Sequence, residues 1–172
     1  MTTTISFRLN GRDASCQGEP QTALLYALRN DLDQHGPRFG CGLAQCGACT
    51  VQLDGQPVRS CVLPVGAVAG REVTTLEGLA ARWQQTGARG KASSVLHPVQ
   101  QAFIDEQAAQ CGYCINGWIM TAAALVEAQP DRTDLQWREA LTGLKCRCGT
   151  QVSVLRAVKR AAQQVMALRA AG

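Results

Sequence analysis

Cysteines are the residues of this sequence best able to do chemistry, and nine of them occur among 172 residues. The N-terminus has no charged region followed by an apolar stretch, so we expect no signal peptide and a cytoplasmic location. Disulfides are rare in that compartment, and an odd number of cysteines cannot all pair within one chain. We therefore expect metal binding or redox chemistry. Eight of the cysteines form two sets of four: Cys41, Cys46, Cys49 and Cys61, and then Cys111, Cys114, Cys146 and Cys148.

The first set has the spacing Cys41-x4-Cys46-x2-Cys49, with eleven residues between Cys49 and Cys61. This is the plant-type [2Fe–2S] pattern. Four thiolates must converge on one cluster, so the backbone has to wrap closely around it and aim its N–H groups at the sulfurs. Glycines suit such a wrap because side chains would clash there. The alternatives are a zinc site, which usually pairs two C-x2–4-C units, or scattered buried cysteines. Three glycines lie inside the loop: Gly40, Gly42 and Gly47.

The second set consists of two pairs, Cys111-x2-Cys114 and Cys146-x-Cys148. Its spacing leaves alternatives open. The pairs could bind zinc, or the C-x-x-C pair could be a thioredoxin-like redox motif, although that motif needs a βαβ context and this half reads as helical. Each pair lies just before an expected helix, and helix N-termini stabilise thiolates and anionic clusters. Two such loops facing each other could supply four ligands to an iron–sulfur cluster.

Short strands and turns are expected in the first half of the chain. Residues 3–9 alternate apolar and polar side chains, and Asn10-Gly11 follows as a hairpin signal. Asp54-Gly55 is a second such signal. Cys16, which belongs to neither set, is expected to be a packed free thiol without chemistry. The remaining expected elements are a helix over 22–32 and strands over 50–53, 58–63 and 72–75.

Helices are expected from Leu76 onward, and the change of composition near residues 74–80 indicates a domain boundary. Thr133 to Gln136 form a capping-box pattern at the start of one of these helices. Residues 84–95 are polar and are expected to form a surface loop. The apolar periodicity predicts helices over 98–107, 115–128, 133–141 and 152–170.

Charge and hydropathy exclude several classes of protein. The formal net charge is +4, and no block of five like charges occurs. The densest basic stretch, formed by Arg156, Lys159 and Arg160, is interpreted as a solvated helix face. We see no nucleic-acid-binding signature. No apolar run reaches the roughly 18 to 20 residues of a transmembrane segment.

Four segments together resemble the small iron–sulfur subunit of the molybdenum hydroxylases, the xanthine oxidase and aldehyde oxidoreductase family. The segments occur in the family's order and span nearly the whole chain: Gly40–Thr50, Arg59–Cys61, Gln110–Cys114 and Cys146–Thr150. Gly36–Cys46 and Ile115–Met120 are most similar to the small subunits of isoquinoline 1-oxidoreductase and nicotinate dehydrogenase. The sequence departs from the family at 84–95, which is longer than usual, and around Asn116, Lys145 and Gln151-Val152. None of these departures removes a cysteine of either set.

The resemblance implies an α+β protein with a β-grasp ferredoxin-like domain over residues 1–76 and an all-α four-helix domain over residues 77–172. Each domain would hold one [2Fe–2S] cluster through its own set of four cysteines. Gln110 and Cys148 would also contact the pterin of a molybdenum cofactor held by a large partner subunit. Two oxidised clusters with their thiolates carry about −4 in total, which offsets the +4 of the chain.

The implied function is electron transfer, from molybdenum through the second and then the first cluster to an external acceptor. No dinucleotide-binding or flavin motif is visible, so we expect a cytochrome or a flavoprotein as acceptor. The expected substrate of the large subunit is an N-heteroaromatic compound, with an aldehyde as the alternative. A free-standing ferredoxin-like carrier and a zinc-binding interaction module are the competing functional classes. The alternative location is the periplasm, which the protein would reach by export together with a partner that carries the signal. A permanent partner predicts exposed apolar surface near Tyr113, Trp118 and Ile119.

Overall fold

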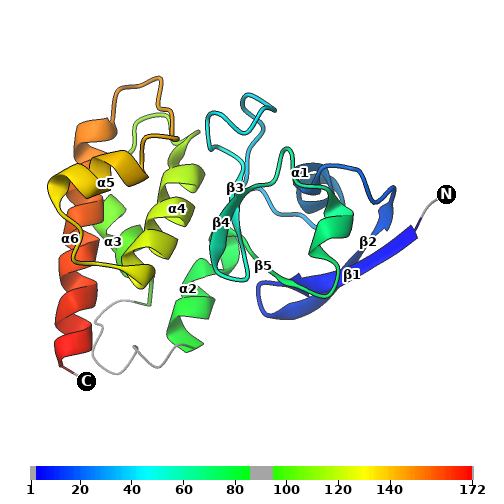
Figure 1. Cartoon of the computed structure of the whole chain (residues 1–172), viewed down its shortest axis with the longest axis horizontal. Helices are drawn as coiled ribbons and strands as arrows, with labels where there is room; N and C mark the ends of the chain where they lie inside the picture. The colour runs from blue at the N-terminus through cyan, green and yellow to red at the C-terminus, as the bar shows by residue number, and fades with distance from the viewer. Residues whose placement is uncertain (1–2, 86–94, 172) are drawn as a thin grey trace.

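The structure, a computed structural model, describes residues 3–85 and 95–171. Strands occupy the first half of the chain and helices the second, so the predicted α+β class is confirmed (Figure 1). Most of the polar loop expected at 84–95 lies outside the described residues. Gln84 and Gln85 belong instead to the end of helix α2 (Leu76–Gln85).

A five-stranded mixed sheet forms the first half, in the order β2-β1-β5-β3-β4. The strands β1 and β5 run parallel, and the other neighbours are antiparallel. Both predicted hairpins are present. In each turn the two central residues have positive φ, as type I′ turns require: Asn10 and Gly11 in one, Asp54 and Gly55 in the other. The strands span Thr3–Leu9 (β1), Arg12–Gly18 (β2), Thr50–Leu53 (β3), Gln56–Arg59 (β4) and Glu72–Thr74 (β5).

Two elements of the first half differ from their predictions. Ala23 pairs with Pro64, so the predicted helix over 22–32 cannot start at Thr22 and becomes a short α1 (Leu24–Tyr26) followed by a π-helix η1 (Ala27–Asp31). The strand predicted over 58–63 ends at Arg59. Both Val62 and Leu63 donate their N–H groups back to the Arg59 carbonyl, which places Cys61 in a turn.

Two hydrophobic cores hold the molecule together. The sheet core contains the apolar face of β1, namely Ile5, Phe7 and Leu9, together with Cys16 of β2 and the 3-10 helix η2 (Val65–Val68). Cys16 is thus a packed thiol within the sheet. The helical core forms between α2 and four later helices: α3 (Pro98–Asp105), α4 (Ile115–Ala128), α5 (Asp134–Ala140) and α6 (Gln151–Ala170).

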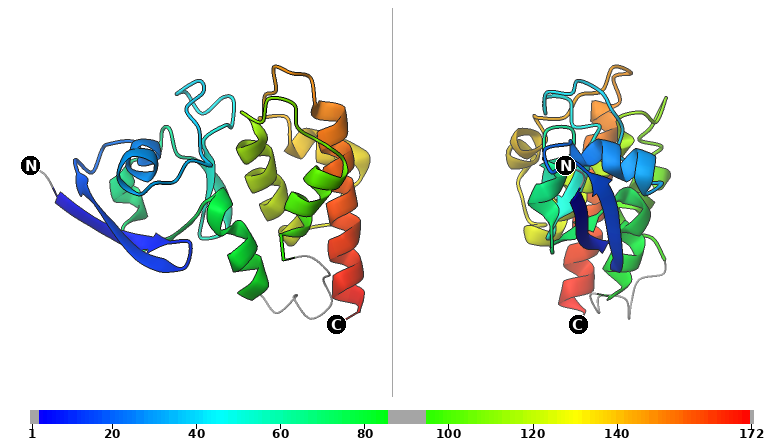
Figure 2. Two further views of the ribbon diagram at one scale, coloured as in Figure 1. Left: turned by 180° about the vertical axis from the view of Figure 1, so that it is seen from behind. Right: turned by 90° about the vertical axis from the view of Figure 1, so that its right-hand side faces the viewer.

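The helix α2 leads from the sheet to the other helices (Figures 1 and 2). Its first residue, Leu76, already packs against the helical core. The domain boundary that we predict between residues 76 and 77 therefore falls inside α2. Capping boxes begin two of the helices, with His97 at the start of α3 and Thr133 at the start of α5. Among residues 3–85 and 95–171, none of the helices has the length and apolar character needed to cross a membrane.

The prediction of exposed apolar surface near Tyr113, Trp118 and Ile119 is confirmed only in part, since Ile119 lines an apolar groove but two of the three side chains are buried. Tyr113 is 50% exposed, but Trp118 and Ile119 are only 4% and 6% exposed. Both lie on α4, which packs against α3, α6 and the sheet at once, so almost all of its faces are covered. The apolar composition of this helix therefore reflects a central position in the fold.

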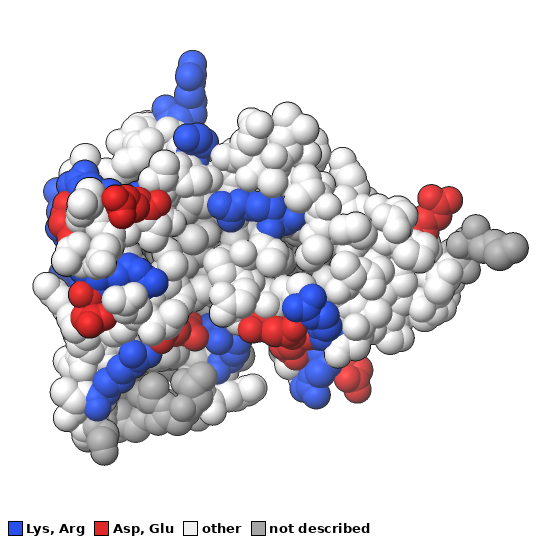
Figure 3. Space-filling model, in the orientation of Figure 1, with Lys and Arg blue, Asp and Glu red and all other residues white. Residues whose placement is uncertain are grey.

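Charged side chains of both signs are interspersed on the face shown in Figure 3. The three residues of the basic stretch on α6 lie in ion pairs rather than forming a purely solvated face. Arg156 and Arg160 pair with Glu106, and Lys159 pairs with Asp134 at 2.7 Å. The basic stretch therefore joins α6 to neighbouring helices.

Candidate metal centres

The loop that carries Cys41, Cys46 and Cys49 wraps around its own sulfur atoms. The N–H groups of Leu43, Gln45 and Cys46 all donate to the Cys41 Sγ, at 3.3, 3.2 and 3.3 Å. The Cys41 N–H in turn donates to the Cys46 Sγ at 3.4 Å. Backbone donors converging on sulfur stabilise negative charge there. The loop thus has the amide lining that the spacing predicts.

Glycines allow this close approach. A Cβ at Gly40 would lie 2.6 Å from the Cys46 Sγ, so a side chain at this position would displace a sulfur. Gly47 has a φ of +82°, and a Cβ there would lie 2.3 Å from the Leu144 side chain in the helical half. The glycines of this loop therefore serve both the local wrap and the contact between the two halves.

The second set lies at the starts of two helices, as predicted. Cys114 is the N-cap residue of α4, and Cys111 precedes it in the same loop. Cys146 and Cys148 precede Thr150, the N-cap of α6, and the Cys146 Sγ lies 3.1 Å from the Thr150 hydroxyl. Cys111 and Cys148 are exposed, as is the neighbouring Gln110, so this corner of the site faces outward.

The eight sulfur atoms meet in pairs. A [2Fe–2S] cluster needs two thiolates on each of its two irons, which is a two-plus-two arrangement. The side chains in hydrogen-bonding contact are Cys41 with Cys46, Cys49 with Cys61, Cys111 with Cys148, and Cys114 with Cys146.

In each set, one cysteine has a pKa lowered to about 7 and another has a pKa raised to about 11. Backbone N–H groups, that of Leu43 foremost, lower the pKa of Cys41 to about 7. Burial opposes ionisation of Cys146, but hydrogen bonds with Thr150 help to lower its pKa to about 7. Burial raises the pKa of Cys49 and of Cys114 to about 11. Since thiolates are the ligands, binding a metal would displace protons from these two buried thiols.

The two cysteine-bearing regions adjoin each other along one edge of the molecule, at the top of Figure 1, where the loops from the sheet and from the helices lie side by side (Figures 1 and 2). The Lys145 N–H donates to the Cys46 carbonyl at 3.0 Å, which links a residue of the first set to the neighbour of Cys146. Arg38 donates to the Gly112 carbonyl at 2.9 Å, between Cys111 and Cys114. Direct backbone contact therefore joins the two sets.

The start of α4 fixes this junction. The Asn116 side-chain amide donates to the carbonyls of Ala48 and Thr50, both at 2.9 Å. The next residue, Gly117, is so close to the first loop that a Cβ on it would lie 2.1 Å from the Gly47 carbonyl oxygen. Sequence reasoning missed these residues as parts of the site. The signal in the sequence was a glycine inside a helical pattern, because such a glycine often marks a position where another segment packs closely against the helix.

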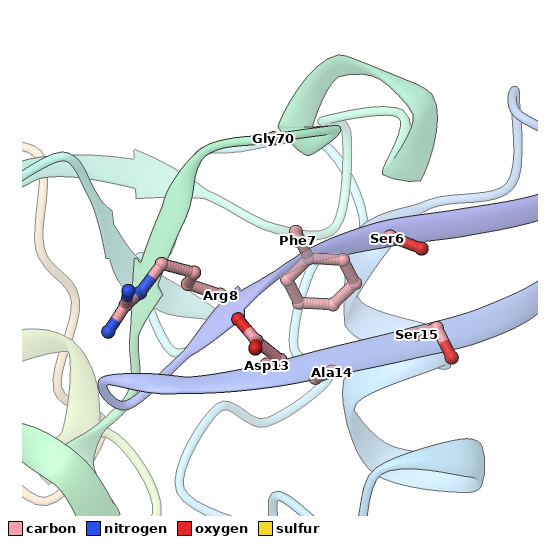
Figure 4. A pocket seen from close by; sticks show the side chains of 7 residues that line it. All are labelled: Ser6, Phe7, Arg8, Asp13, Ala14, Ser15 and Gly70. Atoms are coloured by element: carbon pink, nitrogen blue, oxygen red, sulfur yellow. The ribbon is translucent and has the colours of Figure 1, made fainter.

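A separate hollow of about 420 Å³ lies on the β1-β2 hairpin, away from both cysteine sets (Figure 4). It contains neither cysteine nor histidine, and none of the predicted site residues lines it. Its walls are formed by Ser6, Phe7, Arg8, Asp13, Ala14, Ser15 and Gly70.

Paired thiols in amide-lined loops, one set on a sheet domain and one on helix N-termini, define a two-centre iron–sulfur protein. The comparisons agree. Residues 7–75 match the family model of the 2Fe-2S iron-sulfur cluster binding domain, and residues 75–159 match that of the [2Fe-2S] binding domain. The chain is 54% identical to a nicotinate dehydrogenase subunit of Pseudomonas putida over 163 residues, which cover 95% of this chain and 97% of the relative.

Two further relatives extend the comparison. The alpha subunit of isoquinoline 1-oxidoreductase from Brevundimonas diminuta is 44% identical, over 93% of this chain and 98% of that one. The solved structure of quinoline 2-oxidoreductase from Pseudomonas putida 86 contains a chain that superposes with a TM-score of 0.82 at 29% identity, over 98% of this chain and 96% of that one.

This chain belongs to the family of small [2Fe–2S] subunits of the molybdenum hydroxylases. The family resemblance, the ferredoxin-like and helical halves and the two [2Fe–2S] cofactors are thereby confirmed. So is the predicted function, that of an electron-transfer subunit of an oxidoreductase whose catalysis takes place in another subunit.

Proposed function

We propose that the two sets of cysteines ligate the two clusters, and that electrons pass from a molybdenum centre in a large partner subunit through the second set to the first and then to an external acceptor. The observation that carries this proposal is the hydrogen bond from the Lys145 N–H to the Cys46 carbonyl, which brings the two sets into contact. Each bound cluster supplies a site that accepts and releases one electron. The ligands would be Cys41, Cys46, Cys49 and Cys61 for one cluster, and Cys111, Cys114, Cys146 and Cys148 for the other.

The surrounding residues prepare these sites for electron transfer. N–H groups of Leu43, Gln45 and Cys46 stabilise negative charge on the Cys41 thiolate, and so favour the reduced state. Asn116 and Gly117 hold the first loop against α4 and keep the two sets at a constant separation. These residues therefore position the redox centres and favour their reduction.

The large subunit would bind at the exposed corner of the second set. Gln110 and Cys148 are exposed there, and we assign to them the contact with the pterin of the molybdenum cofactor. An apolar groove of about 440 Å³ adjoins this corner at Ala109 and Ile115. On its rim, Ile104 is 61% exposed although it is a large apolar side chain. Such a patch on a protein surface is typical of a protein interface.

An N-heteroaromatic compound is the proposed substrate of the large subunit, since the names of the relatives refer to nicotinate, isoquinoline and quinoline. The alternative is an aldehyde, because an aldehyde oxidoreductase structure from Desulfovibrio desulfuricans also superposes, at 34% identity. We also place the complex in the cytoplasm. Eight of the nine cysteines belong to the two metal-binding sets, and disulfides are rare in that compartment.

The external acceptor, a cytochrome or a flavoprotein, would bind beside the first set. Phe39 and Leu43 lie within or next to its loop and are about half exposed or more. Tyr26 stacks on Phe39, and Val62 follows Cys61, so that together they extend an apolar surface around these cysteines. This places an apolar contact surface directly beside the last centre of the relay.

Metal analysis of the purified complex tests the cluster assignment. We expect about four iron atoms and four acid-labile sulfides per copy of this chain, as two [2Fe–2S] clusters require. Reduction by substrate should then give two distinct EPR signals. Zinc without acid-labile sulfide would contradict the proposal, as would a single cluster.

The substitution Ile104→Asp tests the proposed interface with the large subunit. A charge in the apolar groove should weaken assembly by at least about tenfold, because burying an unpaired carboxylate costs more than about 1.4 kcal/mol. Co-purification with the large chain measures this. Leu135→Asp is the matched control, since Leu135 is 65% exposed on α5 and does not line the groove. Equal assembly of both variants would argue against this interface.

A further inference from the structure

Trp118 lies one helical turn after Cys114 on α4. Cys114 is the N-cap residue of this helix, and the Trp118 N–H approaches the Cys114 carbonyl at 3.4 Å. Residues four positions apart share one face of a helix, and helical side chains lean toward the N-terminus. The Trp118 side chain is therefore directed back toward Cys114. It is only 4% exposed, so it occupies this position without contact with bulk water.

The indole nitrogen of Trp118 lacks an ordinary hydrogen-bond partner among the described residues. Its Nε1 atom is buried and makes no hydrogen bond of normal geometry to any residue in the ranges 3–85 and 95–171. Indole N–H is a donor only, and buried tryptophans usually place it against an acceptor. A neutral thiol is a weak acceptor, whereas a thiolate is a strong one. A buried donor beside Cys114 is thus suited to the ionised form of that cysteine.

The Cys114 side chain is partly buried and packs against the helical core, which includes Trp118. The Trp118 side chain is within reach of its sulfur. Trp118 therefore occupies the side of Cys114 that faces the helical core.

We propose that Trp118 is a positioning residue of the second metal centre, whose indole N–H donates a hydrogen bond to the Cys114 thiolate and raises the reduction potential of the cluster. The inference rests on the proposed function, since it requires a cluster on Cys111, Cys114, Cys146 and Cys148. Reduction adds negative charge to the cluster and its sulfurs, so a donor to sulfur stabilises the reduced state more than the oxidised state. The residue thereby makes the second centre a better acceptor for electrons from the large subunit.

Trp118→Phe tests this proposal because it keeps an aromatic ring in the core and removes the N–H donor. In the purified complex, we expect the equilibrium constant for reduction of the second cluster to fall about tenfold, a shift of 59 mV to lower potential for one electron. The potential of the first cluster should not change. EPR-monitored redox titration measures both potentials separately.

Trp83→Phe is the matched control. Trp83 is also a buried tryptophan, but its ring packs against His97, whose imidazole contacts Glu127. Glu127 lies thirteen residues beyond Cys114, or about 20 Å along α4. This variant should leave both potentials unchanged. Equal potentials in Trp118→Phe and the unsubstituted protein would overturn the proposal.

A second measurement uses the unsubstituted complex and so does not depend on how the variant folds. With tryptophan labelled by ¹⁵N in the indole ring, pulsed EPR of the reduced second cluster should detect a nitrogen coupling. Absence of that coupling would overturn the inference. Iron and sulfide contents are measured on the same sample. A sample that lacks two iron atoms would contradict the proposed function. A sample with both clusters but no nitrogen coupling would contradict only the role of Trp118.

Discussion

Cys148→Ser is expected to abolish the second cluster, to leave the first intact, and to slow electron exit from the substrate-reduced large subunit by at least about 100-fold. Loss of residues that merely support a metal ligand often costs 10- to 100-fold in affinity or activity, and loss of a ligand should cost more. Cys148 pairs with Cys111 at the exposed corner where we place the large subunit. Removing its thiolate would leave one iron with a single cysteine.

Rapid-mixing spectroscopy of the complex with substrate measures the rate at which electrons leave molybdenum, and EPR identifies the remaining cluster. Cys16→Ala is the control, because Cys16 is a core thiol of β2 outside both sets. It should retain two clusters and the normal rate. If Cys148→Ser still delivered electrons at the normal rate, the proposed order of the relay would be wrong.

Gly117→Ala is expected to destabilise the chain by about 3 kcal/mol, because overpacking of this severity lies at the upper end of the usual range. Alanine is intrinsically better than glycine within a helix by about 1 kcal/mol. The contact at Gly117 reverses that preference, since the new Cβ would meet the Gly47 carbonyl oxygen at 2.1 Å and the Gly47 carbonyl carbon at 2.7 Å. Both of these atoms belong to the backbone, so neither can move aside as the end of a flexible side chain could. To accept the methyl group, α4 must move away from the first cysteine loop.

Thermal unfolding followed by circular dichroism at a fixed scan rate should show a midpoint about 10 °C lower for Gly117→Ala. The control is Gly143→Ala, because the only atom near its Cβ would be the end of the Arg59 side chain at an ordinary 3.6 Å. A midpoint unchanged in both variants would show that α4 and the loop are not in tight contact.

Local patterns predicted the parts of the fold that local chemistry determines. Asn10-Gly11 and Asp54-Gly55 adopt the positive φ that their hairpins need, and Thr133 forms the capping box that its sequence indicates. The cysteine spacings identified both sets. In each of these cases, the residues that determine the structure are neighbours in the sequence or recur at a regular interval.

The remaining features depend on contacts between distant segments, which periodicity does not reveal. Asn116 bonds to Ala48 and Thr50, more than 60 positions away, so its role appears only in three dimensions. Exposed apolar surface near Trp118 and Ile119 was expected from the apolar composition of the helical half and a permanent partner, whereas both side chains belong to the helical core. The predicted start of the helix over 22–32 is wrong because it also depends on a distant segment. The pairing of Ala23 with Pro64 decides where this helix begins.

The hydrogen bond between Lys145 and Cys46 has a consequence for how the complex turns over. Electron tunnelling slows steeply with distance, so carriers with mobile domains depend on a swinging motion that brings their centres together. Here the main chain beside one centre is bonded to the main chain beside the other, and the Asn116 side chain holds the same junction. In the relay that we propose, folding of the chain therefore sets the gap between the two centres, and transfer between them needs no swinging motion.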